Sequence, residues 1–283
     1  MNSPAAPFIT RAPRDAAGWA PCFQVESLPV LEDSIRALDA LRPNEDAVDA
    51  HLLTEVVCAD PLLTLKLMAH VAKLRCARGH ESRGEPETVT AALLLLGIGP
   101  FFRTFAALTS AEAWLAGQPE ALEGFRAVLR CSHRAANFAL GFAVHRMDHD
   151  APVIHAAALL HDFAELLLWL RAPTLALEIA RRQRADTTLR SAAIQSELLN
   201  VELPDLQQVL MTGWKLPPLL VRISDDRHAE ADPVRNVLLA VRVARHSAGG
   251  WDNAALPDDV QDVADLLHLG VEPARRLLLE LDS

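Results

Sequence analysis

Apolar residues recur three and four positions apart along most of the chain, the spacing that places them on one face of an α-helix. One such stretch follows Asp60-Pro61, which favours a helix start because the carboxylate can cap it and proline needs no partner there. The apolar face of this stretch consists of Leu62, Leu63, Leu67, Met68 and Val71. The sequence contains neither a convincing strand nor a repeat of fixed period. We therefore predict an all-α fold.

Capping residues, prolines and glycines divide this pattern into separate helices. Asn44, which Glu45 and Asp46 follow, is a predicted helix start, and Gly97 is a predicted helix end. Together these signals predict helices over residues 30–41, 44–57, 61–74, 87–96, 101–116, 120–146, 153–170, 174–185, 187–199, 205–212, 217–224, 233–247, 258–267 and 271–281.

The first part of the chain differs from the rest. Residues 1–24 are rich in Pro and Ala and show no sustained period, so we predict an N-terminal arm there. This arm either docks on the body through Phe8, Ile9 and Trp19 or moves freely.

Residues 25–283 form the predicted helical domain, and one polar segment divides it. The break at residues 116–119 contains Gly and Pro and separates an N-terminal lobe, about residues 25–116, from a C-terminal lobe, about residues 120–283. We expect the two lobes to pack together.

Composition and charge exclude several classes of protein. The 283 residues are 51% hydrophobic but only 5% aromatic, so the core consists mainly of Leu, Ala and Val. A formal net charge of −10 argues against a nucleic-acid-binding surface, since phosphate neutralisation needs clustered Lys and Arg. The four cysteines are widely spaced and form no C-x-x-C pair, as expected for reduced thiols. Because a signal-peptide pattern and a long apolar stretch are both missing, we predict a cytoplasmic protein without a membrane partner.

The sequence places an adjacent His161-Asp162 pair in the apolar run 157–170. Burying a carboxylate there is costly unless a metal, a cation or a hydrogen-bond donor compensates it. The pair is therefore either half of a working metal site or the remnant of one. Neighbouring side chains on a helix diverge by about 100°, so a shared metal would need ligands from other elements. Candidate ligands are His133, His145, His149, His155, His228 and His246, none at a recognised ligand spacing from His161.

The run around His161-Asp162 resembles the Leu-Leu-His-Asp-Ile-Gly-Lys signature of the HD superfamily of phosphohydrolases. More specifically, the chain resembles the HDOD family, bacterial signalling domains related to that superfamily. Five segments in the family's order carry this resemblance: Leu28-Pro29-Val30-Leu31, Asp60-Pro61-Leu62-Leu63-Thr64-Leu65-Lys66-Leu67, residues 88–97, His161-Asp162 and Gly213-Trp214-Lys215-Leu216-Pro217. The resemblance covers about residues 25–245 and implies an all-α, HDOD-like fold whose C-terminal lobe is HD-like.

The departures from the family pattern fall on the residues that would hold a metal. HD enzymes carry an earlier His before a Ser. If Ser132 takes the place of that Ser, Cys131 replaces the His and His133 is out of register. The Asp of a late helix has no counterpart, since Arg242 occupies that region. The segment Phe163-Ala164-Glu165 replaces Ile-Gly-Lys.

A further departure follows the Trp-x-Leu-Pro motif, where many members have a histidine pair. This chain has Asp225-Asp226-Arg227-His228, in which only His228 can take such a place. These losses leave His161 and Asp162 without the ligands that a water-activating metal needs. The resemblance therefore implies a vestigial site, and we predict that Asp162 pairs with an arginine; the candidates are Arg130, Arg134 and Arg242.

The function predicted from this resemblance is a non-catalytic bacterial signal-transduction module. We expect it to bind a signalling protein partner or a small ligand between the lobes, to need no cofactor or metal, and to act without a fused companion domain. One alternative is a metal-dependent phosphohydrolase of the HD superfamily acting on a nucleotide or cyclic dinucleotide. It would use His161 and Asp162 as metal ligands, with His133 and His155 recruited nearby. A second alternative is a homo-oligomeric scaffold with a large apolar surface patch.

Overall fold

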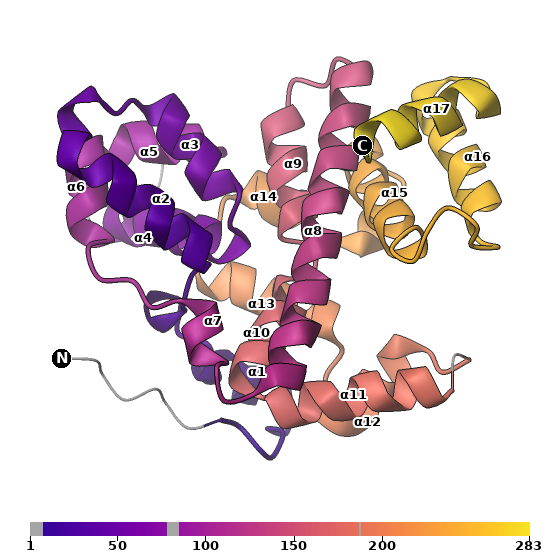
Figure 1. The fold of residues 1–283 in the computed structure, drawn as a ribbon, viewed down its shortest axis with the longest axis horizontal. Coiled ribbons are helices and arrows are strands. Elements are labelled where there is room, and N and C mark those ends of the chain that lie inside the picture. Colours follow the sequence, from indigo (N-terminus) through magenta and orange to yellow (C-terminus); the bar gives the residue numbers. More distant parts are fainter. Residues whose placement is uncertain (1–7, 78–84, 187) are drawn as a thin grey trace. The chain divides into compact units, whose positions relative to one another are not determined.

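The computed structural model describes residues 8–77, 85–186 and 188–283, and it is helical throughout (Figure 1). Over these residues no β-strand forms, and the single β-bridge joins Val30 to Ser110. This architecture confirms the predicted all-α fold.

The chain forms two compact units, each built from separated segments. Unit 1 consists of residues 1–126 and 163–217, and unit 2 of residues 127–162 and 218–283. These units differ from the contiguous lobes that we expected, because residues 163–217 join the N-terminal segment. The indole of Trp19 donates to the carbonyl of Leu199 at 2.8 Å, and that of Trp114 to Leu170 at 2.9 Å. These contacts bind unit 1's two segments together.

Unit 1 contains most of the helices. They are α1 (Ala16–Trp19), α2 (Glu32–Leu41), α3 (Ala50–Cys58), α4 (Pro61–Ala77), α5 (Val89–Leu96), α6 (Ile98–Thr104), α7 (Ala111–Trp114), α10 (Phe163–Arg171), α11 (Pro173–Ala185), α12 (Ser191–Leu199) and α13 (Leu203–Gly213), with the 3-10 turns η1 (Ala20–Cys22), η2 (Val25–Ser27) and η3 (Arg42–Ala47).

Unit 2 is smaller and contains the segment that carries His161 and Asp162. Its elements are α9 (Ala151–Leu159), α14 (Pro218–Ile223), the 3-10 turn η4 (Asp226–His228), α15 (Asp232–His246), α16 (Leu256–Leu267) and α17 (Val271–Leu281). The long helix α8 (Pro119–His145) begins in unit 1 and continues into unit 2.

Two polar side chains, Asp60 at the start of α4 and Lys66 within it, fix the segment before α2 within unit 1. The fully buried Asp60 carboxyl accepts from the backbone N–H groups of Leu31, Leu62 and Leu63 at 2.7–3.1 Å, which confirms Asp60 as a helix cap. The Lys66 ammonium donates to the carbonyls of Glu26 and Leu28 at 2.7 and 2.8 Å. The family motif at residues 60–67 therefore contacts the one at residues 28–31 directly. Its polar side chains, Asp60 and Lys66, stabilise the fold.

Three local predictions needed correction. The helix predicted over 101–116 is split into α6 and α7, and the one over 153–170 is split by a turn at 160–162. Asn44 does not start a helix, because its backbone is non-helical and lies in η3. The cap is Asp49, which accepts from Leu52 N–H at 2.8 Å. Gly97 ends α5 as predicted, with a φ of 85° that glycine adopts without strain.

The described part of the predicted N-terminal arm packs on unit 1. Trp19 is fully buried, and the Ile9 N–H donates to the carbonyl of Arg171 at 2.7 Å. Residues 1–7 lie outside the described part of the chain.

Among the described residues, one stretch, Ala151–Arg171, is long and apolar enough to cross a membrane. Of the 18-residue apolar window within it, 78% is buried inside the protein, as in the core helices of soluble proteins. The turn that contains His161 and Asp162 also interrupts it.

Candidate functional site

The His161-Asp162 pair occupies the turn between α9 and α10. Leu160 ends α9 with φ −94° and ψ 0°, and the His161 N–H reaches back to the carbonyl of Ala158 at 3.3 Å. On a continuous helix the two side chains would diverge by about 100°. In this turn they converge instead, and His161 Nδ1 lies 2.9 Å from Asp162 Oδ1.

Two further side chains of unit 2 extend the pair into a row of four, which we call the ionic chain. Asp226 of η4 lies with its two carboxylate oxygens 3.1 and 3.2 Å from His161 Nε2. Arg245 of α15 donates from Nη2 to Asp162 Oδ1 at 2.6 Å. The order is therefore Asp226, His161, Asp162, Arg245, with carboxylates and cations in alternation.

The inner members of the ionic chain are buried and the outer members reach solvent. The side chains of His161 and Asp162 are 9% and 13% exposed, whereas those of Asp226 and Arg245 are 36% and 50% exposed. A buried charge needs a close partner of opposite sign, and each inner charge here has one on either side. Solvent therefore reaches the chain mainly at its two ends.

The protonation state follows from these contacts. Burial alone would lower the pKa of His161, but the carboxylates of Asp162 and Asp226 outweigh it and raise that pKa to about 9. Burial would raise the pKa of Asp162, but Arg245 and His161 hold it well below its usual range. At neutral pH His161 is therefore an imidazolium whose two N–H groups both donate, and Asp162 is ionised.

This arrangement does not fit a divalent metal ion. A histidine ligand offers a neutral ring nitrogen to the metal, and both nitrogens of His161 face carboxylates. One carboxylate oxygen of Asp162, Oδ1, already accepts from two cationic donors, one of them a guanidinium. In the part of the chain that the structure describes, no group of three or more His, Cys, Asp or Glu side chains has a metal-binding arrangement.

The arginine that neutralises Asp162 is not one of the three candidates from the sequence. Arg242 instead donates to Asp259 at 2.6 Å, and the same buried carboxylate contacts His246 Nδ1 at 2.5 Å. Arg134 donates to Asp282 at 2.7 and 2.8 Å. Arg245, three positions after Arg242 on α15, makes the contact instead, whereas the candidates Arg130 and Arg134 lie on α8.

The predicted neighbours His133 and His155 form a separate pair within unit 2. Burial, and then the nearby His133, lower the pKa of His155, so its imidazole is neutral at pH 7. His155 therefore differs in charge state from His161. Their proposed recruitment to a metal with His161 stays a prediction of the phosphohydrolase alternative.

Sequence reasoning missed two members of the ionic chain, Asp226 and Arg245. Asp226 lies in the Asp225-Asp226-Arg227-His228 stretch, where the family pattern drew attention to His228. Arg245 lies near the end of α15, on the helix already suspected of facing the pair. An unexplained acidic doublet that follows a family motif was the signal that could have led to Asp226.

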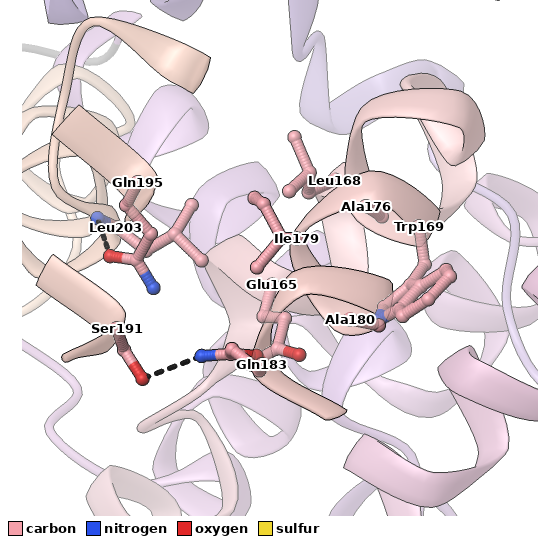
Figure 2. A pocket seen from close by; sticks show the side chains of 10 residues that line it. All are labelled: Glu165, Leu168, Trp169, Ala176, Ile179, Ala180, Gln183, Ser191, Gln195 and Leu203. Atoms are coloured by element: carbon pink, nitrogen blue, oxygen red, sulfur yellow. Dashed lines mark hydrogen bonds between the residues drawn. The ribbon is translucent and has the colours of Figure 1, made fainter. Parts of the chain in front are cut away.

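Unit 1 also contains a narrow pocket between α10, α11 and α12, which Figure 2 shows. Its lining includes the buried Trp169, whose indole N–H has no partner among the described residues, and Gln183, which donates to Ser191 at 2.8 Å. The volume of about 50 Å³ suffices for a few water molecules. This pocket is therefore large enough for water but too small for a substrate.

Comparisons with known proteins give a family match and similar folds. The model of a family described as the HDOD domain matches residues 28–230. The response regulator MmoQ from Methylococcus capsulatus str. Bath has 21% identity and a TM-score of 0.66, with 90% of this chain and 99% of that chain covered. A virulence factor from Campylobacter jejuni subsp. jejuni has 17% identity and a TM-score of 0.61, with 86% and 85% covered. No curated protein matches the chain.

Proposed function

Because the chain belongs to the HDOD family, as the match over residues 28–230 shows, we propose that it is a non-catalytic signal-transduction module of the bacterial cytoplasm. It acts by binding a partner protein or a small ligand. The family match also confirms the resemblance that the five sequence motifs carry.

The observation that carries this proposal is the ionic chain. Hydrolysis by an HD-type site needs a metal that lowers the pKa of a bound water molecule. Here a guanidinium and an imidazolium surround Asp162 where that metal would lie, and Asp226 covers the second nitrogen of His161. The site is electrically complete without an ion, so its residues hold α9, η4 and α15 together.

Exposed apolar side chains support the binding of a partner protein. In unit 1, Leu94 and Leu95 of α5 and Leu52 of α3 are exposed, although α3 and α5 pack on each other. In unit 2, Val144 and Met147 near the end of α8 are exposed. One fold neighbour is described as a response regulator, which agrees with a signalling role, but the likeness at 21% identity is one of fold.

Metal content and hydrolysis test the proposal together. Protein purified without chelator is analysed for Mn, Fe and Zn, and then assayed with Mn²⁺ on a nucleotide, a cyclic dinucleotide and bis(p-nitrophenyl) phosphate. We expect no stoichiometric metal and no hydrolysis above that of His161→Ala. Stoichiometric metal and hydrolysis that both vanish in His161→Ala would establish the phosphohydrolase alternative instead.

A matched pair of variants shows whether the arginine is what keeps metal away. Arg245→Met removes the guanidinium beside Asp162, and Arg242→Met removes a neighbouring one that binds Asp259. We expect weak Zn²⁺ or Mn²⁺ binding to appear only in Arg245→Met. Tight metal binding by the unaltered protein would contradict the proposal.

A further inference from the structure

Unit 1 holds a second, larger pocket that the proposed function does not use. Its volume is about 370 Å³, within the range of small-molecule sites. One wall is a face of α4, and the others are η2 and the segment 104–108, which begins at the last residue of α6. All of these elements belong to the same unit, so the pocket is complete within unit 1.

The polar groups of this pocket lie along α4. Lys66 is only 8% exposed, and its ammonium donates to the backbone carbonyls of Glu26 and Leu28, so it belongs to the fold. Lys73, two turns further along, is 71% exposed and is 2.8 Å from the Glu26 carboxylate. The Lys73 ammonium is therefore paired with one carboxylate and, having three N–H donors, can also bind a ligand.

His70 lies between these two lysines on the same face of α4. Its ring packs edge-on against Phe105 with 6.0 Å between centroids, and neither ring nitrogen has a hydrogen-bond partner among the described residues. Burial, and then the charge of Lys73, lower the pKa of His70, so the ring is neutral and can donate one hydrogen bond.

The remaining lining is mostly apolar. Phe105 is buried, Leu74 and Leu108 are half-buried, and Ala107 lies exposed near them. A ligand that fills the pocket must therefore carry an apolar body against these side chains and a polar group toward Lys73 and His70.

We propose that this pocket binds an amphiphilic monocarboxylate, with its carboxylate at Lys73 and His70 and its apolar body against Phe105 and Leu108. The ionised Glu26 at the same end neutralises part of the lysine charge and disfavours a dianion such as a phosphate monoester. Among the described residues that line the pocket there is no arginine, the side chain best suited to phosphate. The inference concerns unit 1 alone and holds whether or not unit 2 is catalytic.

Calorimetric titration of the full chain with three probes of equal chain length tests this assignment. Octanoate carries the carboxylate, octanamide is its neutral counterpart, and octyl phosphate carries a dianion. We expect octanoate to bind at least tenfold more tightly than either of the others. No detectable octanoate binding, or octyl phosphate binding as tight as octanoate, would overturn the proposal.

Variants then locate the binding in this pocket. Lys73→Met removes an exposed amine, and Arg36→Met removes an exposed cation from α2 as the matched control. We expect Lys73→Met to weaken octanoate binding at least tenfold, and Arg36→Met to leave it unchanged. Ala107→Trp adds a large ring at an exposed lining position, and we expect it to abolish binding with an unaltered thermal unfolding midpoint. Equal binding by the unaltered protein, Lys73→Met and Ala107→Trp would overturn the assignment.

Discussion

The two units bury ionisable side chains in opposite ways. In unit 1, Asp60 and Lys66 are satisfied almost entirely by backbone groups of residues 25–31 and of α4 itself. In unit 2, His161 and Asp162 are satisfied by other ionised side chains. Backbone partners fix a segment in one position, whereas side-chain partners can change rotamer, titrate or be displaced.

This difference distinguishes residues that stabilise the fold from residues whose contacts a partner or a ligand can change. Both pairs lie in motifs that the chain shares with the HDOD family. The Asp60 and Lys66 contacts are closed to solvent, while the ionic chain of unit 2 ends in the partly exposed Asp226 and Arg245. A partner or a ligand could therefore act on unit 2's site without unfolding either unit.

The largest expected effect is the loss of the Asp60 carboxyl. Asp60→Ala leaves three N–H groups without their partner in a dry site, which costs about 3–5 kcal/mol of unfolding free energy. Asp162→Ala should cost less, about 2–3 kcal/mol, because Asp226 still pairs with His161 and water still reaches Arg245. Hydrogen exchange followed on peptides of each unit measures both losses. A larger loss for Asp162→Ala would reverse the comparison.

Alkaline pH should also change the stability of the two units in opposite directions. The pKa of folded His161 is raised to about 9, so its stabilisation is complete below its ordinary value of 6.5 and is lost as pH rises through 9. Burial lowers the pKa of folded Lys66 to about 8, so the cost of its charge disappears as pH rises from 8 to 10.5. Each contribution is roughly 3 kcal/mol.

Unfolding free energies measured between pH 6 and 10 test this contrast. His161→Gln should remove the decline between pH 6.5 and 9, and Lys66→Met should remove the gain above pH 8. If both substitutions left the pH profile unchanged, the two displaced pKa values would be wrong.

A smaller contrast concerns two glycines of α8, one in each unit. A Cβ at Gly124 would lie 2.4 Å from the Trp169 indole, a rigid ring that cannot give way. A Cβ at Gly141 would lie 2.4 Å from a terminal methyl of Leu281, the far end of a flexible side chain that can change rotamer. Alanine improves helix propensity by about 1 kcal/mol. We therefore expect Gly124→Ala to destabilise the protein by about 1–2 kcal/mol and Gly141→Ala to be nearly neutral in thermal unfolding. Equal destabilisation by the two would show that Leu281 is held as firmly as Trp169.

Within the ionic chain, the smallest expected effect is that of Arg245→Met. The half-exposed guanidinium contributes about 1 kcal/mol to stability, since water can replace part of its contact with Asp162. Chemical denaturation should resolve this loss, with Arg36→Met as the control for removal of an exposed cation. A loss of stability larger than that caused by Asp162→Ala would contradict the expectation that the exposed end of the ionic chain contributes less than its inner part.

Helix starts and ends that depend on residues close together in the sequence could be predicted from local signals. The Asp60 cap and the Gly97 helix end follow from single residues and their position, and both are confirmed. The break at residues 160–162 was missed because apolar spacing continues across it, so periodicity alone could not distinguish two helices from one.

Contacts between distant segments could not be predicted in the same way. Asp226 lies 65 residues from His161, and Arg245 lies 83 residues from Asp162. Arg242 and Arg245 lie on the same side of α15, about 60° and roughly 4.5 Å apart, so which of them meets Asp162 depends on small shifts in how that helix is placed. The family resemblance indicated where charge would gather, but the partners needed coordinates.

The charge state of His161 is the most direct test of the account. Nitrogen-15 NMR of the imidazole at pH 7 should show both ring nitrogens protonated, and one equivalent of Zn²⁺ or Mn²⁺ should leave the His161 signals unchanged. A neutral ring whose nitrogen signal shifts or broadens on addition of one equivalent of metal would contradict it.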